Sequence, residues 1–181
     1  MNFCSNCGSA NIVIKIPEGD NLPRFCCRDC IAVHYQNPNM VVGAIPVWDG
    51  KILLARRNIE PRKGLWNLPC GFLELNETVE AGAMREVLEE TGAAVILGPL
   101  QTVFNLVKAQ QVYLIFTAKM LNSSFTTTAE SAEVKLFSIN EIPWDEIAFS
   151  SNTFALKAFI ADLKMGNNNV HFGTYKHNSK K

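Results

Sequence analysis

The sequence predicts a mixed α/β domain preceded by a small cysteine-bearing module. Five of the six cysteines fall within the first 30 residues, and four of these form two CxxC pairs. Apolar runs of strand length recur further along the chain and are separated by turn residues. Two longer segments, 78–92 and 152–166, carry apolar residues at helical spacing. We therefore predict a module at 1–36 and an α/β (α+β) domain at 37–181, in which the sheet dominates.

Length and charge set the class of protein. The chain has 181 residues, with 17 acidic and 17 basic side chains, which is enough for one full domain with a core and a small appendage. The balanced charge offers no large basic field, so a nucleic-acid partner is not expected. The apolar run 112–116 is too short to span a bilayer, and no secretory signal follows Met1. We expect a cytoplasmic protein with no membrane partner and a solvated tail at 176–181.

The elements of the domain follow from local patterns. A hairpin is predicted around the Asp49–Gly50 turn, and a short strand in 65–73 breaks at a glycine turn. In the helix at 78–92, Ala81, Met84 and Leu88 are expected on the buried face, with Gly92 as the stop. Three further strands are predicted in 93–107, 110–120 and 134–139. The amphipathic helix 152–166 would bury Phe154, Leu156, Ala158, Phe159, Ile160 and Leu163 and end at Gly166.

The cysteines of the module have the spacing of a zinc site. Cys4 and Cys7 form one CxxC pair, and Cys27 and Cys30 form the other about 19 residues later. Four thiolates bind zinc tetrahedrally and leave no position open for catalysis, so a structural zinc is predicted. Cys26 is the alternative to Cys27, but only Cys27 keeps the two-residue spacing to Cys30. The alternative interpretation is that these cysteines are reduced thiols in a poorly ordered tail.

The segment REVLEETG, residues 85–92, concentrates three glutamates on one helix. Glu86 and Glu90 share a face at a spacing of four, and Glu89 is adjacent. Their carboxylates can converge on one point, where a hard divalent cation such as Mg²⁺ would offset their repulsion. Such a cation also binds phosphate oxygens, so a phosphate ester or anhydride is the natural substrate. A solvated acidic helix face is the alternative explanation of this charge run.

The longer string GFLELNETVEAGAMREVLEETGA, residues 71–93, resembles the Nudix box. Every specified position matches, with Val87 as the first aliphatic residue and Ala93 as a weak match at the last. The resemblance implies a Nudix α/β/α sandwich with a mixed sheet, preceded here by a zinc ribbon. It also implies a Nudix hydrolase that acts with Mg²⁺ or Mn²⁺ on a nucleoside diphosphate linked to another moiety, and a homodimer.

The resemblance assigns roles by position. Glu86, Glu89 and Glu90 inherit the metal-binding roles, and Arg85 pairs with Glu77 to orient them. Cys70 stands where the family more often has glycine, and its backbone carbonyl takes the place of a further metal ligand. The general base is expected from the box or from a later loop, where Glu133 is the first candidate and Glu130 the second.

The substrate is predicted from a closer likeness. The segments at 35–43, 56–74 and 141–166, together with the box, resemble the zinc-ribbon ADP-ribose/FAD pyrophosphatase group. This likeness implies AMP plus ribose 5-phosphate, or AMP plus FMN, as products. The NADH pyrophosphatases, which also act on NAD-capped RNA, are the alternative, but their Ser-Gln-Pro-Trp-Pro-Phe-Pro signature is absent. A non-catalytic nucleotide- or RNA-binding protein is the third possibility.

Other candidates have weaker patterns. Arg56, Arg57 and Lys63 precede or lie in a turn near the box, where they would pair with the diphosphate unless they form a solvated strand end. Trp66, Phe104 and Tyr113 are assigned to the core in preference to base stacking. The three histidines, His34, His171 and His177, show no ligand spacing and receive no role.

Overall fold

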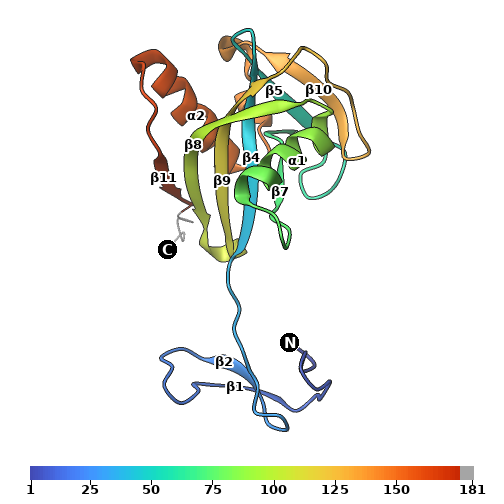
Figure 1. The fold of residues 1–181 in the computed structure, drawn as a ribbon, viewed down its shortest axis with the longest axis vertical. Helices are drawn as coiled ribbons and strands as arrows, with labels where there is room; N and C mark the ends of the chain where they lie inside the picture. Colours follow the sequence, from blue (N-terminus) through green and yellow to red (C-terminus); the bar gives the residue numbers. More distant parts are fainter. Residues whose placement is uncertain (176–181) are drawn as a thin grey trace. The chain divides into compact units, whose positions relative to one another are not determined.

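The computed structural model describes residues 1–175 and divides into two units, Met1–Asn37 and Pro38–Lys181 (Figure 1). The sequence predicts this boundary one residue earlier, between residues 36 and 37. The predicted tail at 176–181, with His177, lies outside the described residues. Within residues 1–175, neither helix combines the length and the apolar character that a bilayer crossing needs.

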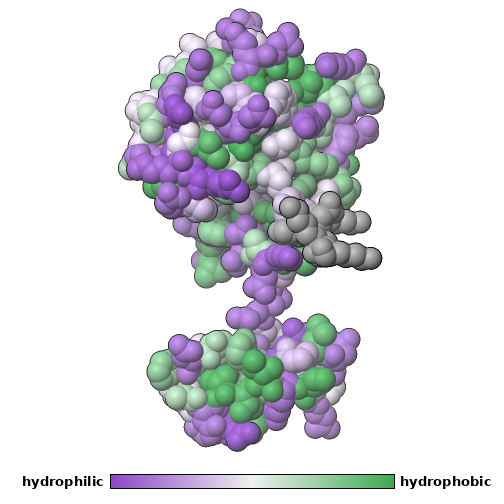
Figure 2. Space-filling model, turned by 180° about the vertical axis from the view of Figure 1, so that it is seen from behind, coloured by the Kyte–Doolittle hydropathy of each residue, from purple (hydrophilic) through white to green (hydrophobic). Residues whose placement is uncertain are grey.

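The small unit is a three-stranded antiparallel sheet with almost no hydrophobic core. Its strands are β1 (Ile12–Lys15), β2 (Arg24–Cys27) and β3 (Val33–His34). The buried apolar side chains of this unit are cysteines, whereas Phe3, Ile14 and Ile31 are exposed. Figure 2 shows hydrophobic residues gathered on the surface of this unit. A sheet this small needs a cross-link to hold its fold, because its apolar residues are mostly not buried.

The larger unit is built on a mixed sheet with the order β10-β5-β4-β9-β8-β11. Strand β4 runs parallel to β9, and β8 runs parallel to β11, while the other pairs are antiparallel. The strands are β4 (Asn39–Trp48), β5 (Lys51–Arg57), β6 (Trp66–Asn67), β7 (Cys70–Phe72), β8 (Val95–Leu106), β9 (Gln111–Met120), β10 (Ser131–Phe137) and β11 (His171–Thr174). The helices are α1 (Val79–Thr91) and α2 (Ser150–Met165), with short 3-10 turns at Val107–Ala109, Ile139–Glu141 and Trp144–Glu146.

The hairpin between β4 and β5 forms where the sequence predicted it. Asp49 and Gly50 both adopt positive φ angles, 47° and 73°. A two-residue hairpin turn requires this conformation at both positions, and Asp-Gly tolerates it. The turn fixes the register in which Val47 faces Ile52.

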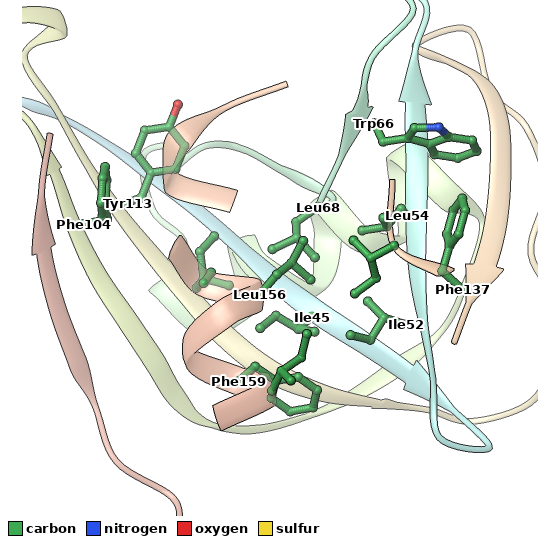
Figure 3. Close-up of a cluster of buried hydrophobic side chains, with 14 of the residues drawn as sticks. Ile45, Ile52, Leu54, Trp66, Leu68, Phe104, Tyr113, Phe137, Leu156 and Phe159 are labelled. Atoms are coloured by element: carbon green, nitrogen blue, oxygen red, sulfur yellow. The ribbon is translucent and has the colours of Figure 1, made fainter. Parts of the chain in front are cut away.

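The helices cover opposite faces of the sheet, as the alternation along β4 shows. Val41 and Ile45 belong to the core that includes Leu156 and Phe159 of α2. Figure 3 shows this cluster, in which Leu156 and Phe159 reach the aliphatic side chains of β4 and β5. The alternate residues of β4 pack instead with Ala83 and Val87 of α1. The predicted α/β/α sandwich with a mixed sheet is therefore confirmed.

Helix α1 has the predicted ends but not the predicted buried face. Its N-cap Thr78 accepts a hydrogen bond from the Ala81 amide at 3.1 Å, and Gly92 closes it in the left-handed conformation. Ala81, Met84 and Leu88 are nevertheless exposed, so the predicted face was wrong. The helix is rotated so that its inner face contains Ala83 and Val87 together with Glu86 and Glu90. The buried face of α1 therefore includes two carboxylates, which an apolar pattern cannot predict.

Helix α2 starts two residues before its predicted start and ends at Gly166 as predicted. Leu163 of the predicted apolar face is exposed. The following strand β11 was not predicted. It is held by the buried Asp162, whose Oδ2 accepts from Gln101 Nε2 at 2.9 Å and pairs with His171 Nε2 at 2.8 Å. His171 therefore has a structural contact, although its spacing gave it no role.

Candidate functional site

A cavity of about 780 Å³ opens where β7 leads toward α1. The lining residues come from β4, β5, β6, β7, α1 and β9, from the segments after β5 and β7, and from the segments before β10 and α2. The lining includes Glu86, Glu89, Glu90 and Arg85 of the helix, which the sequence analysis selected as a group. It also includes Cys70 and Gly71, so the glycine turn and the helix meet at one place.

Each of the three glutamates of α1 accepts a hydrogen bond from a neighbouring group. Arg85 Nη1 donates to Glu86 Oε1 at 2.7 Å and to Glu89 Oε2 at 3.0 Å. Glu90 Oε1 accepts from the Cys70 backbone amide at 3.2 Å. Glu86 and Glu90 are buried, whereas Glu89 is exposed. One helix therefore presents two desolvated carboxylates and one solvated carboxylate to the cavity.

Burial changes the ionisation of the inner carboxylates. It raises the pKa of Glu90 to about 8, and it also raises the pKa of Glu86 above its ordinary value. The negative charge of Glu130 adds to both increases. Desolvated carboxylates with like-charged neighbours favour a cation among them, because the charged form is otherwise costly.

Arg85 is fixed by contacts on its other side. Its Nη2 donates to Glu77 Oε1 at 2.7 Å and to the Phe72 carbonyl at 3.1 Å, and its Nε donates to Glu77 Oε2 at 3.0 Å. The two parallel bonds to one carboxylate form a bidentate pair, which fixes the guanidinium plane. Arg85 lowers the pKa of Glu77 to about 2. The Glu77–Arg85 pair thus positions the carboxylates that face the cavity.

The donor set suits a hard divalent cation. Carboxylate oxygens are the ligands that Mg²⁺ and Mn²⁺ take, and burial raises the pKa of both Glu86 and Glu90. Within residues 1–175, the glutamate oxygens do not gather within 4.8 Å of one another as the cysteine sulfurs do, and Arg85 lies among them. The set fits metal binding in the charge and type of its ligands.

The two loop glutamates have different surroundings. Glu130 lines the cavity and precedes β10, where the Asn58 amide donates to its carbonyl at 2.8 Å. Glu133 does not line the cavity; its Oε2 lies 3.5 Å from Arg56 Nη1. Of the two candidates for the general base, the geometry favours Glu130.

The three basic residues predicted to contact the diphosphate differ in whether they reach the cavity. Arg57 lines the cavity, donates from Nε to the Pro61 carbonyl at 2.8 Å, and lies 5.2 Å from the Phe149 ring centroid. Arg56 donates instead from Nε to the Gly64 carbonyl at 2.7 Å and does not line the cavity. Lys63 is exposed and does not line the cavity. The structure thus brings one of the three predicted cations to the site.

Several lining residues were not selected from the sequence as site residues. Gln111, Tyr113 and Phe149 line the cavity, although Tyr113 was assigned to the core and the other two had no role. Tyr113 is in fact both, since it also packs in the α2-side core. Trp66 is buried and meets Phe137 edge-on, in agreement with its core assignment. No local pattern in the sequence singles out Gln111 or Phe149.

The cysteines of the small unit gather as a second candidate site. The sulfurs of Cys4, Cys7, Cys27 and Cys30 all lie within 4.8 Å of one another. The Cys4–Cys30 and Cys7–Cys27 separations are 3.6 and 3.7 Å, close to the roughly 3.8 Å expected around a tetrahedral zinc with Zn–S bonds of about 2.3 Å. These four residues fit a structural zinc.

The neighbours of the four cysteines decide between Cys26 and Cys27 and place His34 beside the cluster. Cys26 Sγ turns away and donates to the Arg24 carbonyl at 3.6 Å, so Cys27 is the member of the group. His34 Nε2 lies 3.3 Å from Cys4 Sγ, although its spacing in the sequence gave it no role. Asn6 Nδ2 donates to Cys30 Sγ and lowers the pKa of that thiol to about 6.

Comparisons with known proteins agree with both sites. The NUDIX domain model matches residues 37–157, and the Nudix N-terminal model matches residues 2–36. The crystal structure of a NUDIX hydrolase from Nitrosomonas europaea is 45% identical, covers 98% of this chain and 100% of that chain, and superposes with a TM-score of 0.93.

Two relatives differ in the activity that their names give. The ADP-ribose pyrophosphatase of Methanocaldococcus jannaschii is 31% identical over 113 residues, which span 60% of this chain and 67% of the relative. The NAD-capped RNA hydrolase NudC of Vibrio atlanticus is 37% identical over 94 residues, and the match spans 51% of this chain but 32% of NudC. The chain therefore belongs to the NUDIX domain family and is a Nudix hydrolase with a Nudix N-terminal zinc-ribbon module.

Proposed function

We propose that the chain hydrolyses the pyrophosphate bond of a nucleoside diphosphate linked to another moiety, with Mg²⁺ or Mn²⁺ as the cofactor. ADP-ribose and FAD are the proposed substrates, and AMP plus a phosphorylated product are the proposed products. The observation that carries this proposal is the convergence of Glu86, Glu89 and Glu90 on a cavity that is large enough for a small ligand.

The residues of α1 would hold the metal. Glu86, Glu89 and Glu90 offer carboxylate oxygens, and the Cys70 carbonyl is a further proposed ligand by family resemblance. When bound, a divalent metal neutralises the diphosphate and lowers the pKa of a coordinated water. Arg85 keeps the carboxylates in place through its bidentate pair with Glu77.

The chain supplies a base and a cation from other elements. Glu130 is the proposed general base, because it lines the cavity near Glu86 and Glu90 and is solvent-exposed, so that a water can reach it. Arg57 is the proposed diphosphate contact, since it is the predicted arginine that reaches the cavity. Arg56 pairs with Glu133 outside the cavity lining, so we propose no direct contact between Arg56 and the diphosphate.

ADP-ribose is favoured by the relative that bears this activity in its name and that matches over two thirds of its own length. FAD is proposed from the resemblance of the segments around the box to the zinc-ribbon ADP-ribose/FAD group. Both substrates share an AMP moiety and a diphosphate, so the same site can act on either of them.

A second candidate is the hydrolysis of NADH or of the NAD cap of RNA. The NudC relatives favour it, although the chain matches only about a third of their length. The missing Ser-Gln-Pro-Trp-Pro-Phe-Pro signature and the balanced charge weigh against it. A non-catalytic nucleotide-binding role is the third candidate, and the complete set of box glutamates weighs against that role.

The test is hydrolysis of ADP-ribose, FAD, NADH and NAD-capped RNA with Mg²⁺ or Mn²⁺, in ¹⁸O-labelled water. The labelled product identifies the phosphorus that water attacks. Glu89→Gln and Glu90→Gln are expected to abolish turnover without unfolding the protein. Glu80→Gln on the same helix is the matched control, because Glu80 is exposed and does not line the cavity. Normal turnover in both site variants would contradict the metal assignment.

We also propose a structural zinc on the four clustered cysteines and a homodimer, the latter from family resemblance. One chain has a mass of 20.1 kDa, so light scattering distinguishes a dimer from a monomer. A measured mass of one chain would contradict the dimer without affecting the proposed chemistry.

A further inference from the structure

The cavity has two halves with different chemistry. Its acidic half carries the glutamates already described. Its neutral half is formed by Val41, Asn67, Gln111, Tyr113 and Phe149, none of which is charged at neutral pH. The proposed chemistry occupies the acidic half, so the neutral half is free to bind the part of the substrate that does not react.

The fold places these neutral residues side by side. Gln111 and Tyr113 are two residues apart on β9, so their side chains share one face of the sheet. Val41 of β4 is the register partner of Tyr113. Val41 and Tyr113 both belong to the α2-side core, and Phe149 is the residue that caps the start of α2. The neutral half therefore lies on the α2 side of the sheet, whereas the glutamates come from α1.

A hydrogen bond between Tyr113 and Gln111 fixes how the Gln111 amide is oriented in the neutral half. The Tyr113 hydroxyl donates to Gln111 Oε1 at 3.2 Å, which leaves the amide Nε2 of Gln111 as the outward donor. Within residues 1–175, Gln111 Nε2 has no hydrogen-bond acceptor. Burial raises the pKa of Tyr113 to about 12, so the phenol stays protonated and keeps its orienting bond at neutral pH. Figure 3 shows the Tyr113 hydroxyl pointing away from the aliphatic core.

The shape and charge of this half suit a flat, uncharged group. Phe149 and Tyr113 offer aromatic surface, and Arg57 lies against the Phe149 ring at 5.2 Å from its centroid. Aromatic side chains stack on nucleobases of any sequence, and a neighbouring amide donor then recognises the acceptor atoms on the base edge. Arg57, the proposed diphosphate contact, lies at the border of this half beside Phe149, whereas the five residues of the half carry no charge.

We propose that the neutral half is the nucleobase subsite and that Gln111 selects the base by donating from Nε2 to an acceptor on its edge, while Tyr113 orients the Gln111 amide. The proposal rests on the proposed function, because it places the diphosphate between this subsite and the glutamates. Gln111 is the specificity-determining residue, and Tyr113 is a positioning residue.

The experiment compares two substrate series with the full-length protein. In the first, ADP-glucose, GDP-glucose, UDP-glucose and CDP-glucose differ only in the base. In the second, ADP-ribose, ADP-glucose and FAD share the adenine and differ in the second moiety. Wild type is expected to vary more in kcat/KM across the first series than across the second. Gln111→Leu is expected to reduce the spread across the base series by about tenfold, the effect of losing one hydrogen bond of about 1.4 kcal/mol.

Two further variants separate selection from folding. Tyr113→Phe keeps the aromatic ring and removes the orienting hydroxyl, so it is expected to reduce the spread less than Gln111→Leu. Gln110→Asn is the matched control: Gln110 is exposed, does not line the cavity and has a positive φ of 54°, which asparagine tolerates. The control is expected to keep the wild-type spread.

Each outcome decides the proposal. A uniform fall in kcat/KM across all four bases in Gln111→Leu would overturn it, as would a wild type that ignores the base and discriminates the second moiety. If wild type hydrolyses no substrate, the proposed function fails, and equilibrium binding of AMP, GMP, UMP and CMP then decides the subsite. Equal binding of the four nucleotides by wild type and Gln111→Leu would overturn the subsite, and a base preference lost in the variant would support it.

Discussion

The Glu86 carboxylate occupies the space that a side chain at Gly71 would need. A Cβ on Gly71 would collide with both carboxylate oxygens of Glu86, which lies on a different element. The glycine of the turn is therefore required by close approach, and not by an unusual backbone conformation, since its φ is not positive. The turn and the helix therefore approach each other closely where Gly71 faces the Glu86 carboxylate.

Gly71→Ala is expected to displace the Glu86 carboxylate and to lower kcat by about 100-fold, the cost of misplacing a catalytic group by about 1 Å. Steady-state hydrolysis of the best substrate measures the loss, and circular dichroism checks the fold. Gly50→Asn is the control, because nothing lies within 4 Å of a Cβ at this hairpin glycine and asparagine tolerates its positive φ of 73°. A Gly71→Ala enzyme with wild-type kcat would contradict the coupling.

The neighbouring cysteines of β2 provide a test of the zinc site. Cys27→Ser is expected to lower the bound zinc from about one ion per chain to almost none, because it removes one of four thiolates. Cys26→Ser is expected to retain the zinc, since Cys26 Sγ bonds to the Arg24 carbonyl outside the cluster. Elemental analysis of the two purified variants makes the measurement. Loss of zinc from Cys26→Ser alone would reverse the assignment.

The Glu77–Arg85 pair predicts a pH-dependent stability. The pKa of Glu77 is lowered from 4.5 to about 2 in the folded protein, so its stabilising contribution is fully present above pH 4.5 and is lost as the pH falls toward 2. Glu77→Gln is therefore expected to be less stable than wild type at pH 7, and the difference is expected to shrink toward zero near pH 2.

Tryptophan fluorescence in denaturant measures this difference for the larger unit alone, because Trp48, Trp66 and Trp144 all lie in it. Protonation of the zinc-binding cysteines at low pH then does not enter the signal. Glu80→Gln on the same helix serves as the control and should match wild type at both pH values. A difference between wild type and Glu77→Gln that stays constant from pH 7 to pH 2 would rule out the ion pair as its cause.

Local signals made much of the fold predictable. Thr78 and Gly92 mark the ends of α1 by capping chemistry that depends only on near neighbours, and Asp49–Gly50 defines its hairpin in the same way. The box glutamates were identified together because one helix carries them. The cysteine pairs were equally local, since each CxxC turn delivers two sulfurs from one short segment.

Features set by distant parts of the chain were not predictable. The apolar pattern of α1 selected Ala81, Met84 and Leu88, but packing against the sheet turned the helix toward Ala83 and Val87. Strand β11 has only four residues, and its position depends on the contact between Asp162 and His171. The same reason applies to the site, where Gln111 and Phe149 reach the cavity from elements far apart in sequence.

The two loop glutamates give the sharpest test of the mechanism, because the sequence favoured one and the cavity favours the other. Glu130→Gln is expected to lower kcat by about 10² to 10⁴, the usual contribution of a general base, with little change in KM. Glu133→Gln is expected to change kcat by less than about threefold, since Glu133 is an exposed partner of Arg56.

Glu130 also raises the pKa of Glu86 and Glu90 by its charge, so its removal affects the metal-binding carboxylates as well. Easier ionisation of these carboxylates strengthens cation binding, whereas the lost negative charge of Glu130 weakens it, so Mn²⁺ affinity is expected to change little if Glu130 is the base and not a ligand. Mn²⁺ titration followed by electron paramagnetic resonance measures this affinity independently of turnover. A large loss of Mn²⁺ affinity in Glu130→Gln would make Glu130 a metal ligand, and a large fall in kcat for Glu133→Gln alone would restore Glu133 as the base. A fall in kcat at constant Mn²⁺ affinity, seen in Glu130→Gln and not in Glu133→Gln, assigns proton transfer to the loop that precedes β10.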